Sequence, residues 1–212
     1  MDSYLVDCYD LTQISFSKPK KYGEYLASRV KYNGSDELYI QFPKMKITNI
    51  NPKGIELEFG TNRYNKKMFT WLSKLDEFIT ETVEANSKEW FNKELSKSQI
   101  TQMYNKCIKA PKALDGQCTV GFAISPKTVL LNSKNQEILL DSFKELKEVE
   151  CISQLKFVVF SKDTCFLSWE VCTAKLDTRL KKVPQCAFIE DPDDCNIESE
   201  ETNEEQLSLC FF

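Results

Sequence analysis

The sequence contains no histidine and only six glycines in 212 residues, and each shortage argues against particular classes of function. Without an imidazole group there is no Ser-His or Cys-His nucleophile pair, no histidine general base and no histidine ligand for a metal. The few glycines form no complete phosphate-binding loop motif, which argues against the common kinase and dehydrogenase motifs. We therefore assign no catalytic residue, no metal site and no cofactor, and we do not expect an enzyme.

Long apolar runs are also missing. The longest, such as residues 157–160, are far shorter than the roughly 20 residues that a membrane-spanning helix needs. The first four residues, Met-Asp-Ser-Tyr, carry an acid where a secretory signal carries bases. Nine cysteines are scattered without a C-x-x-C pair. We therefore expect an intracellular protein without a membrane span, whose thiols are reduced and mainly structural.

Charge divides the chain into two parts. Residues 190–212 contain nine acidic residues and no lysine or arginine, whereas residues 1–189 contain 28 basic and 23 acidic residues, a formal charge of +5. An acidic segment with little apolar content cannot bury enough surface to offset the entropy lost on ordering. The sequence therefore predicts a basic body over residues 1–189 and an acidic tail over residues 190–212, disordered over residues 190–206.

The tail ends in two aromatic residues, Phe211 and Phe212. One interpretation is that this end packs on the body as a last strand. The other is a tethered linear motif, in which the acids steer the tail towards a basic partner and the aromatic end fills a pocket there. We favour the second interpretation and predict that Phe211 and Phe212 bind a partner.

The body begins with short segments rich in Tyr, Ile, Val, Leu and Phe, which are separated by turn signals at residues 33–36 and 51–54. Apolar residues recur with a period of two, as in a half-buried sheet. The predicted strands are 3–8, 12–18, 24–32, 37–42, 44–49 and 54–59.

A helical pattern follows over about residues 65–110. An apolar stripe at steps of three and four predicts a helix over 66–86. Ser96 and Gln99 have the spacing of a capping box, and Pro111 marks the end of a second helix. Strand patterns then return at 117–124, 128–131, 136–140, 148–160 and 164–176, and the last two predict a hairpin.

This order predicts a mainly β (α+β) body with helices inserted between strands. An OB-fold-like barrel with its helix between the third and fourth strands is one host for the insertion, and a jelly roll is the other. Periodicity alone does not decide between them.

Basic and aromatic residues interleave on the predicted strand faces, which is typical of OB barrels that bind single strands by stacking bases and pairing phosphates. Lys156 and Phe160, for example, fall on the face opposite Leu155, Phe157 and Val159. The plainer interpretation of each lysine is an ordinary solvated surface. The candidate DNA-binding residues are Tyr39, Gln41, Lys44, Lys46, Arg63, Tyr64, Lys66, Lys67, Lys156 and Phe160.

Three motifs carry a resemblance to a known family: Gln-Phe-Pro-Lys-Met at 41–45, Asn-Ser-Lys-Glu-Trp-Phe at 86–91 and Phe-Leu-Ser-Trp-Glu-Val at 166–171. They resemble a protein family of nucleocytoplasmic large DNA viruses, which itself looks like the single-stranded DNA-binding proteins of T-seven-type phages. The chain departs from the pattern at Phe42, where relatives tend to have threonine, and at Asn92, where a glycine is expected.

The resemblance implies an OB fold and sequence-independent binding of single-stranded DNA in viral replication, recombination or repair. It also implies an acidic tail whose aromatic end contacts replication proteins, and a location at the viral replication site in the host cytoplasm or nucleus. A homodimer is compatible with this plan. The alternative is a structural or virion-associated β-sandwich protein without a nucleic-acid ligand.

Overall fold

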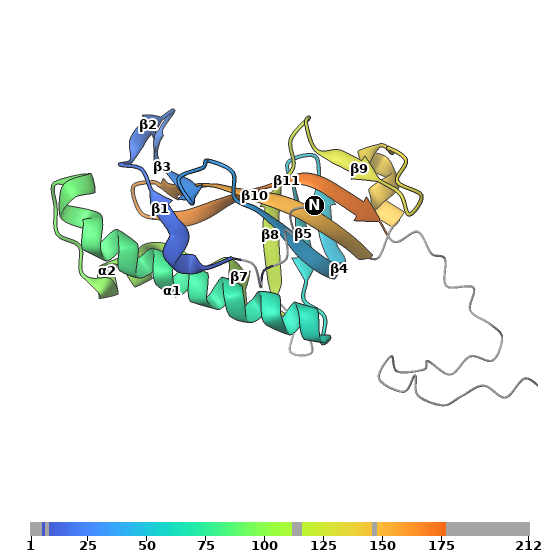
Figure 1. Ribbon diagram of the computed structural model, residues 1–212, viewed down its shortest axis with the longest axis horizontal. Helices are drawn as coiled ribbons and strands as arrows, with labels where there is room; N and C mark the ends of the chain where they lie inside the picture. The colour runs from blue at the N-terminus through green and yellow to red at the C-terminus, as the bar shows by residue number, and fades with distance from the viewer. Residues whose placement is uncertain (1–5, 7–8, 112–115, 146–147, 177–212) are drawn as a thin grey trace, which may run out of the picture. The chain divides into compact units, whose positions relative to one another are not determined.

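The computed structural model describes residues 6, 9–111, 116–145 and 148–176 (Figure 1). This part is mainly β, with helices inserted between strands, as predicted. Its strands are β1 (Ile14–Phe16), β2 (Lys20–Tyr22), β3 (Tyr25–Tyr32), β4 (Tyr39–Asn51), β5 (Gly54–Glu58), β6 (Tyr104–Asn105), β7 (Ile108–Lys109), β8 (Thr119–Ala123), β9 (Val129–Leu131), β10 (Glu148–Phe160) and β11 (Cys165–Leu176). Its helices are α1 (Arg63–Phe91) and α2 (Lys97–Met103), with 3-10 turns η2 (Leu11–Gln13) and η3 (Leu140–Glu145).

Five strands pair into a ring in the order β4, β5, β8, β11, β10 and back to β4. Every pairing is antiparallel except that of β8 with β11, which is parallel and joins one residue pair, Ala123 with Glu170. The ring is therefore partly open at this seam, as OB barrels are. A single ring of this kind favours the OB-like alternative over a jelly roll.

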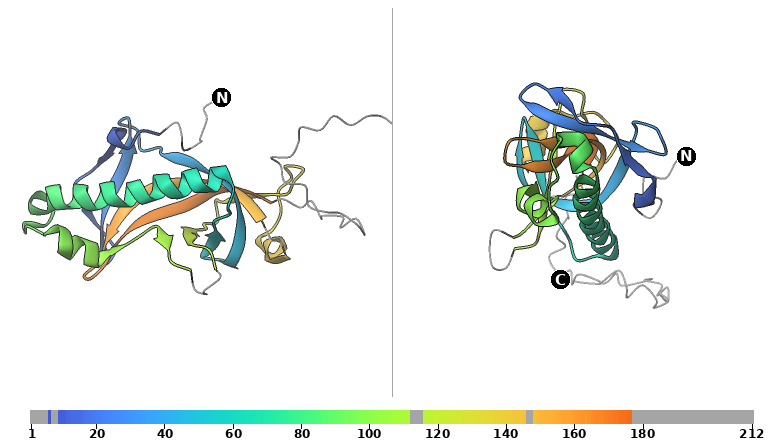
Figure 2. Two further views of the ribbon diagram at one scale, coloured as in Figure 1. Left: turned by 90° about the horizontal axis from the view of Figure 1, so that it is seen from below. Right: turned by 90° about the vertical axis from the view of Figure 1, so that its left-hand side faces the viewer.

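The place of the helices in the ring differs from the prediction. Both α1 and α2 lie between β5 and β8, which are the second and third strands of the ring, and not between the third and fourth. Figure 2 shows α1 running along the outside of the long β10–β11 hairpin. The sequence shows strand patterns before β4, but β1, β2 and β3 form an extension of the sheet outside the ring, so the first strand of the ring is β4.

The helix α1 contains the predicted stripe and extends beyond it at both ends. Met68, Leu72 and Ile79 lie on its buried face. The side chain of Asn62 caps its first turn by accepting a 2.9 Å hydrogen bond from the Asn65 N–H group. Asn92 ends it in the left-handed conformation, with φ of 54°, which asparagine tolerates almost as glycine does. Within the described residues, no helix is both long and apolar enough to cross a membrane.

Other boundaries differ from the sequence pattern for identifiable reasons. The capping box of Ser96 and Gln99 is present, but α2 ends at Met103 because the residues after it form the short strands β6 and β7. The two predicted strands 37–42 and 44–49 are one strand, β4, with Pro43 inside it. Pro43 lies at a bulge in the pairing with β10, where no ladder hydrogen bond is required of it.

The remaining differences are local. The predicted strand 136–140 contributes only an isolated bridge at Glu137 and runs into η3. The predicted strand 3–8 lies, apart from Val6, outside the described residues. The boundary at 189/190 and the acidic tail also lie outside the described residues and stay predictions.

The core of the ring is aromatic. Phe42 of β4 packs edge-on against Phe122 of β8 and Trp169 of β11, with ring centroids 4.6 and 5.5 Å apart. Buried cysteines complete this core, and burial raises the pKa of Cys151 and of Cys165 to about 12. These thiols stay protonated at neutral pH, which fits a structural role.

Candidate nucleic-acid interface

A groove of about 470 Å³ lies on the ring, between the β4–β5 loop, β5, β8 and the segment around β6 and β7. The groove has a polar wall and an aromatic floor. Its polar lining consists mainly of three lysines and three asparagines: Lys53, Lys106, Lys109, Asn49, Asn51 and Asn105. Glu56 is the only carboxylate among the described residues that line it. The groove is therefore basic and rich in hydrogen-bonding side chains.

The place of the groove in the fold is informative. OB barrels bind oligonucleotides on the face of their second and third strands and on the loops beside it. In this ring those strands are β5 and β8, and the loop between the first two strands covers residues 51–54. The groove is lined by both strands and by that loop.

The β4–β5 loop is held by the side chain of Asn51. Its Oδ1 atom accepts hydrogen bonds from the backbone N–H groups of Lys53 at 2.9 Å and Gly54 at 3.2 Å. This local turn explains why asparagine stands at this position. It fixes the backbone that carries the exposed Lys53 at the edge of the groove.

The buried carboxylate of Glu56 positions a second lysine of the groove, Lys109. Glu56 is 8% exposed, accepts a 2.8 Å hydrogen bond from the Thr119 hydroxyl group and lies 3.8 Å from Lys109 Nζ. A Cβ atom added at Gly121 would stand 3.2 Å from the same Nζ atom, so the ammonium group lies over the glycine. Lys109 is therefore positioned across β8 while its side chain stays 55% exposed.

The floor of the groove is aromatic. Phe122 and Trp169 are buried beneath it, and Phe166 is half-buried and belongs to the lining. The indole group of Trp169 is buried beside the Cys107 thiol. Basic and aromatic residues therefore meet on this surface, although they are not the residues that the sequence indicated.

Four of the predicted DNA-binding residues do come together, at a second cavity of about 330 Å³ between β4 and the start of α1. They are Gln41, Lys44, Tyr64 and Lys67. The fully buried side chain of Asn65 joins the two elements, since its Nδ2 atom donates a 3.1 Å hydrogen bond to the Lys44 carbonyl. Tyr64 is 64% exposed, so its ring is open to a ligand.

The other predicted residues are elsewhere. Arg63 and Lys66 are exposed on the first turns of α1 and line neither cavity. Tyr39 is half-buried, and its carbonyl accepts a hydrogen bond from the Tyr9 hydroxyl group. Both remaining lysines form ion pairs: Lys46 Nζ lies 3.7 Å from Glu58 Oε1, and Lys156 pairs with Glu170.

Phe160 does not present a stacking face. It is 5% exposed and packs edge-on against Trp90 and Phe91. The cause is a register shift between Leu155 and Phe157, which interrupts the strict alternation of faces along β10. Beyond this bulge Phe160 points inward, so it belongs to the core and not to the surface.

The sequence carried part of the signal for the groove. The turn at residues 51–54 is recognisable between two strand patterns, and a lysine at its tip was available as a candidate. Because Pro111 marks the end of the second predicted helix, the sequence predicts Lys106 and Lys109 to be helical. In the structure α2 ends at Met103, so both lysines lie after it. Their approach to β8 depends on the pairing of β7 with β8, which no local pattern announces.

The structure is similar to those of two phage proteins. The single-stranded DNA-binding protein from bacteriophage Enc34, solved in complex with single-stranded DNA, has 15% identity and a TM-score of 0.44, covering 75% of this chain and 93% of that one. The single-stranded DNA-binding protein gp2.5 encoded by bacteriophage T7 has 10% identity and a TM-score of 0.45, covering 76% of this chain and 98% of that one.

Sequence comparison gives a family but no curated relative. A search of the curated proteins finds no significant match. Residues 44–192 match a family of unknown function, DUF5871, and this range is more than half of the chain. The chain therefore belongs to the family of unknown function DUF5871.

Proposed function

We propose that the protein binds single-stranded DNA without sequence preference, through the basic groove on β5 and β8. The observation that supports this proposal most directly is the convergence of Lys53, Lys106 and Lys109 with three asparagines on that face. Lysines neutralise phosphates and release counterions, and asparagine side chains donate to phosphate and sugar oxygens. Neither interaction depends on the base sequence.

The aromatic residues favour a single strand over a duplex. Stacking on Phe166, or on the exposed ring of Tyr64 at the second cavity, requires bases that are not already paired and stacked. Sequence readout in a duplex usually needs a helix or a β-ribbon in the major groove. The exposed surface of α1 carries both signs of charge, with Lys74 and Lys88 beside Glu77 and Glu81, and so does not form a basic recognition helix.

The cavity beside α1 forms a second part of the proposed surface. Gln41, Lys44 and Lys67 surround it, and Glu150 lies on its lining as well. The mixed charges make this part a weaker phosphate site than the groove. We assign it a supporting role in holding the strand.

The resemblance of the sequence to single-stranded DNA-binding proteins of nucleocytoplasmic large DNA viruses supports a role in viral DNA replication, recombination or repair. On this proposal the acidic tail recruits replication proteins through Phe211 and Phe212, which lie outside the described residues. The protein would act at the viral replication site in the host cytoplasm or nucleus.

The test is a fluorescence-anisotropy titration of labelled oligo-dT with the full chain at several salt concentrations. Lys53→Ala and Lys106→Ala should each weaken binding about 3- to 10-fold and reduce the slope of log affinity against log salt by about 0.7. Lys74→Ala, which removes an exposed lysine of α1 outside the groove, serves as the matched control and should change little. No binding at low salt, or equal competition by duplex DNA, would contradict the proposal.

A further inference from the structure

The β2–β3 hairpin presents an aromatic and basic face that is separate from both cavities. Its loop has two residues, Gly23 and Glu24. Gly23 has a φ of 61°, the positive value that two-residue hairpin turns require at their first position and that glycine adopts without strain. Tyr22 lies opposite Tyr25, and Lys20 lies opposite Ala27. Because paired residues share a face of the sheet, Lys20, Tyr22 and Tyr25 lie on one side of the hairpin.

The same side continues onto β10. Arg29 follows Tyr25 by four residues on β3 and lies opposite Phe157. On the other side of β3, the residues that flank Arg29, Ser28 and Val30, are fully buried. The bulge after Leu155 that turns Phe160 inward also leaves Phe157 only half-buried, beside Arg29.

Three of these side chains are already stacked. The rings of Tyr22 and Phe157 lie 6.1 Å apart at an angle of 30°, and the Arg29 guanidinium carbon lies 5.6 Å from the centroid of Phe157. Tyr22 is nevertheless 72% exposed and Tyr25 is 48% exposed. Tyr22 therefore keeps most of its surface open to solvent although it stacks on Phe157. Large aromatic rings exposed to this degree are candidates for binding a partner.

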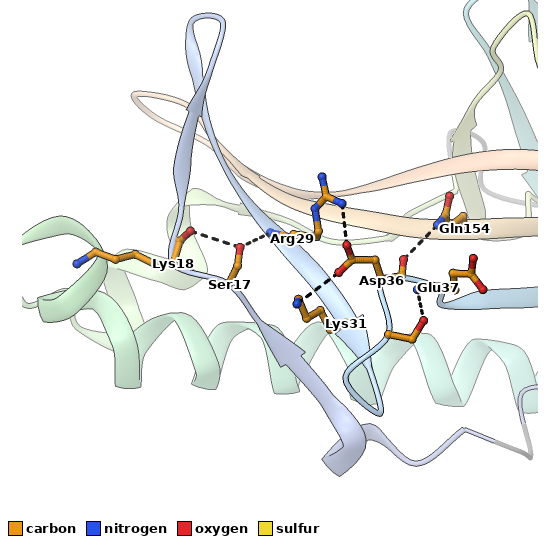
Figure 3. Close-up of polar contacts among 8 residues, drawn as sticks. Ser17, Lys18, Arg29, Lys31, Asp36, Glu37 and Gln154 are labelled. Carbon is orange, nitrogen blue, oxygen red and sulfur yellow. Dashed lines mark hydrogen bonds and ion pairs between the residues drawn. The ribbon is translucent and has the colours of Figure 1, made fainter.

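Charge around the hairpin is mainly positive. Between residues 18 and 31 there are five cationic side chains, Lys18, Lys20, Lys21, Arg29 and Lys31, and one carboxylate, Glu24. Figure 3 shows Arg29 and Lys31 pointing to the same carboxylate, Asp36, at 2.8 and 3.6 Å. This contact fixes the guanidinium group close to Phe157.

We propose that the β2–β3 hairpin is a further contact site for single-stranded DNA, where bases stack on Tyr22 and Tyr25 and phosphates pair with Lys20 and Arg29. This inference rests on the proposed function and adds a specific part of the strand's path. Open aromatic faces among cations are the chemistry that single-strand binding uses. An apolar protein partner fits less well, since the lysines would be desolvated on contact.

The test compares Tyr22→Ala with Tyr22→Phe in the full chain, on oligo-dT and on a strand of equal length made of abasic sites. Both variants should fold, because the residue is 72% exposed, and thermal unfolding checks this. Tyr22→Ala should weaken binding of oligo-dT about 5- to 100-fold, as the loss of a stacked base predicts. Tyr22→Phe keeps the ring and should stay within about twofold of the wild type.

The abasic strand separates stacking from charge. Without bases there is nothing to stack, so Tyr22→Ala and the wild type should bind it equally, whereas Lys53→Ala should weaken binding of both strands. A second readout uses oligonucleotides that carry photoreactive iodouracil, which should crosslink to Tyr22 or Tyr25 in the wild type.

Several outcomes would overturn the inference. If Tyr22→Ala binds oligo-dT like the wild type while Lys53→Ala is weakened, the hairpin is not a contact site although the proposed function holds. An equal loss on the abasic strand would mean that Tyr22 acts through structure. Unchanged DNA binding together with reduced self-association in ultracentrifugation would make the hairpin a protein contact. If the wild type binds no single strand at all, the proposed function fails and this inference fails with it.

Discussion

The carboxylate of Asp76, buried on α1, accepts a 2.7 Å hydrogen bond from the hydroxyl group of Tyr104, the first residue of β6. The backbone N–H of Cys107 donates to the same carboxylate at 3.1 and 3.2 Å. Tyr104 in turn pairs with Cys165 of β11. Burial, together with the nearby thiol and carboxylate, raises the pKa of Tyr104 above its usual value, so its hydroxyl group remains a donor. A single carboxylate thus ties α1 to the ring and positions the segment that carries Lys106 and Lys109.

Tyr104→Phe should therefore destabilise the protein. The variant keeps the ring but leaves the buried carboxylate of Asp76 with one donor fewer, which should cost about 1.5–3 kcal/mol. Urea unfolding measures the difference, with Tyr64→Phe at an exposed position as the control. A free energy of unfolding equal to that of the wild type would show that the Tyr104 hydroxyl group does not stabilise the fold.

Two glycines of the groove should respond differently to alanine. A Cβ atom at Gly54 would stand 2.7 Å from the carbonyl oxygen of Phe122, and a backbone group in a ladder has little freedom to move. At Gly121 the obstacle is Lys109 Nζ at 3.2 Å, the end of a flexible side chain. Gly54→Ala should cost about 1–3 kcal/mol of stability, as overpacking does, and Gly121→Ala clearly less. Equal effects in thermal or urea unfolding would contradict this distinction.

The sequence predicted the elements better than their assembly. Two strand patterns separated by the turn residues 161–164 located the β10–β11 hairpin to within one residue, and the apolar stripe located α1. Both patterns are local. The end of α2 was missed because the pairing of β6 and β7 with distant strands overrides the helical pattern after Met103.

The same reason explains why the sequence indicated residues of the second cavity but none of the groove. Asn65 joins the first half of β4 to the start of α1, and this contact brings together Gln41, Lys44, Tyr64 and Lys67, whose residue types suggested a binding surface. The groove depends on the long-range pairing of β7 with β8, and the aromatic face of the β2–β3 hairpin depends on the pairing of β3 with β10 and on a bulge in β10. A bulge inverts which residues face outward, so Phe157 and Phe160 exchange the roles that alternation gave them.

The ion pair between Lys156 and Glu170 across the β10–β11 hairpin should make stability depend on pH. Burial acts to raise the pKa of Glu170, but hydrogen bonds from Lys156 and Ser125 and nearby lysine charges lower it overall below its ordinary value. A carboxyl whose pKa is lowered on folding stabilises the fold above its unfolded pKa, and this contribution is lost as the pH falls through the folded value.

Glu170→Gln should accordingly be less stable than the wild type at pH 7, by up to about 1 kcal/mol because the pair is partly exposed. The difference should shrink as the pH falls below about 4.5. Urea unfolding at several pH values measures it, with Glu89→Gln at an exposed position of α1 as the control. A difference that stays constant down to pH 3 would assign the effect to packing and not to charge.

Asp36 should act as an internal competitor for the cations of the β2–β3 hairpin. It lies 2.8 Å from Arg29 and 3.6 Å from Lys31, and the hydrogen bond from Arg29 lowers the pKa of Asp36. At neutral pH the carboxylate is therefore charged and neutralises cations that a DNA phosphate would otherwise meet. Asp36→Asn removes this charge, while the backbone carbonyl that accepts from Gln154 remains.

Asp36→Asn should bind oligo-dT about 2- to 5-fold more tightly at low salt, with a slope of log affinity against log salt steeper by about 0.7. Glu89→Gln removes one negative charge from the exposed surface of α1 and tests whether net charge alone explains the gain. Anisotropy titrations at matched ionic strength compare the three proteins. Weaker binding by Asp36→Asn would contradict the competition. It would mean that the carboxylate holds the Arg29 guanidinium group in place for the strand, and that losing this positioning weakens binding more than removing the negative charge strengthens it.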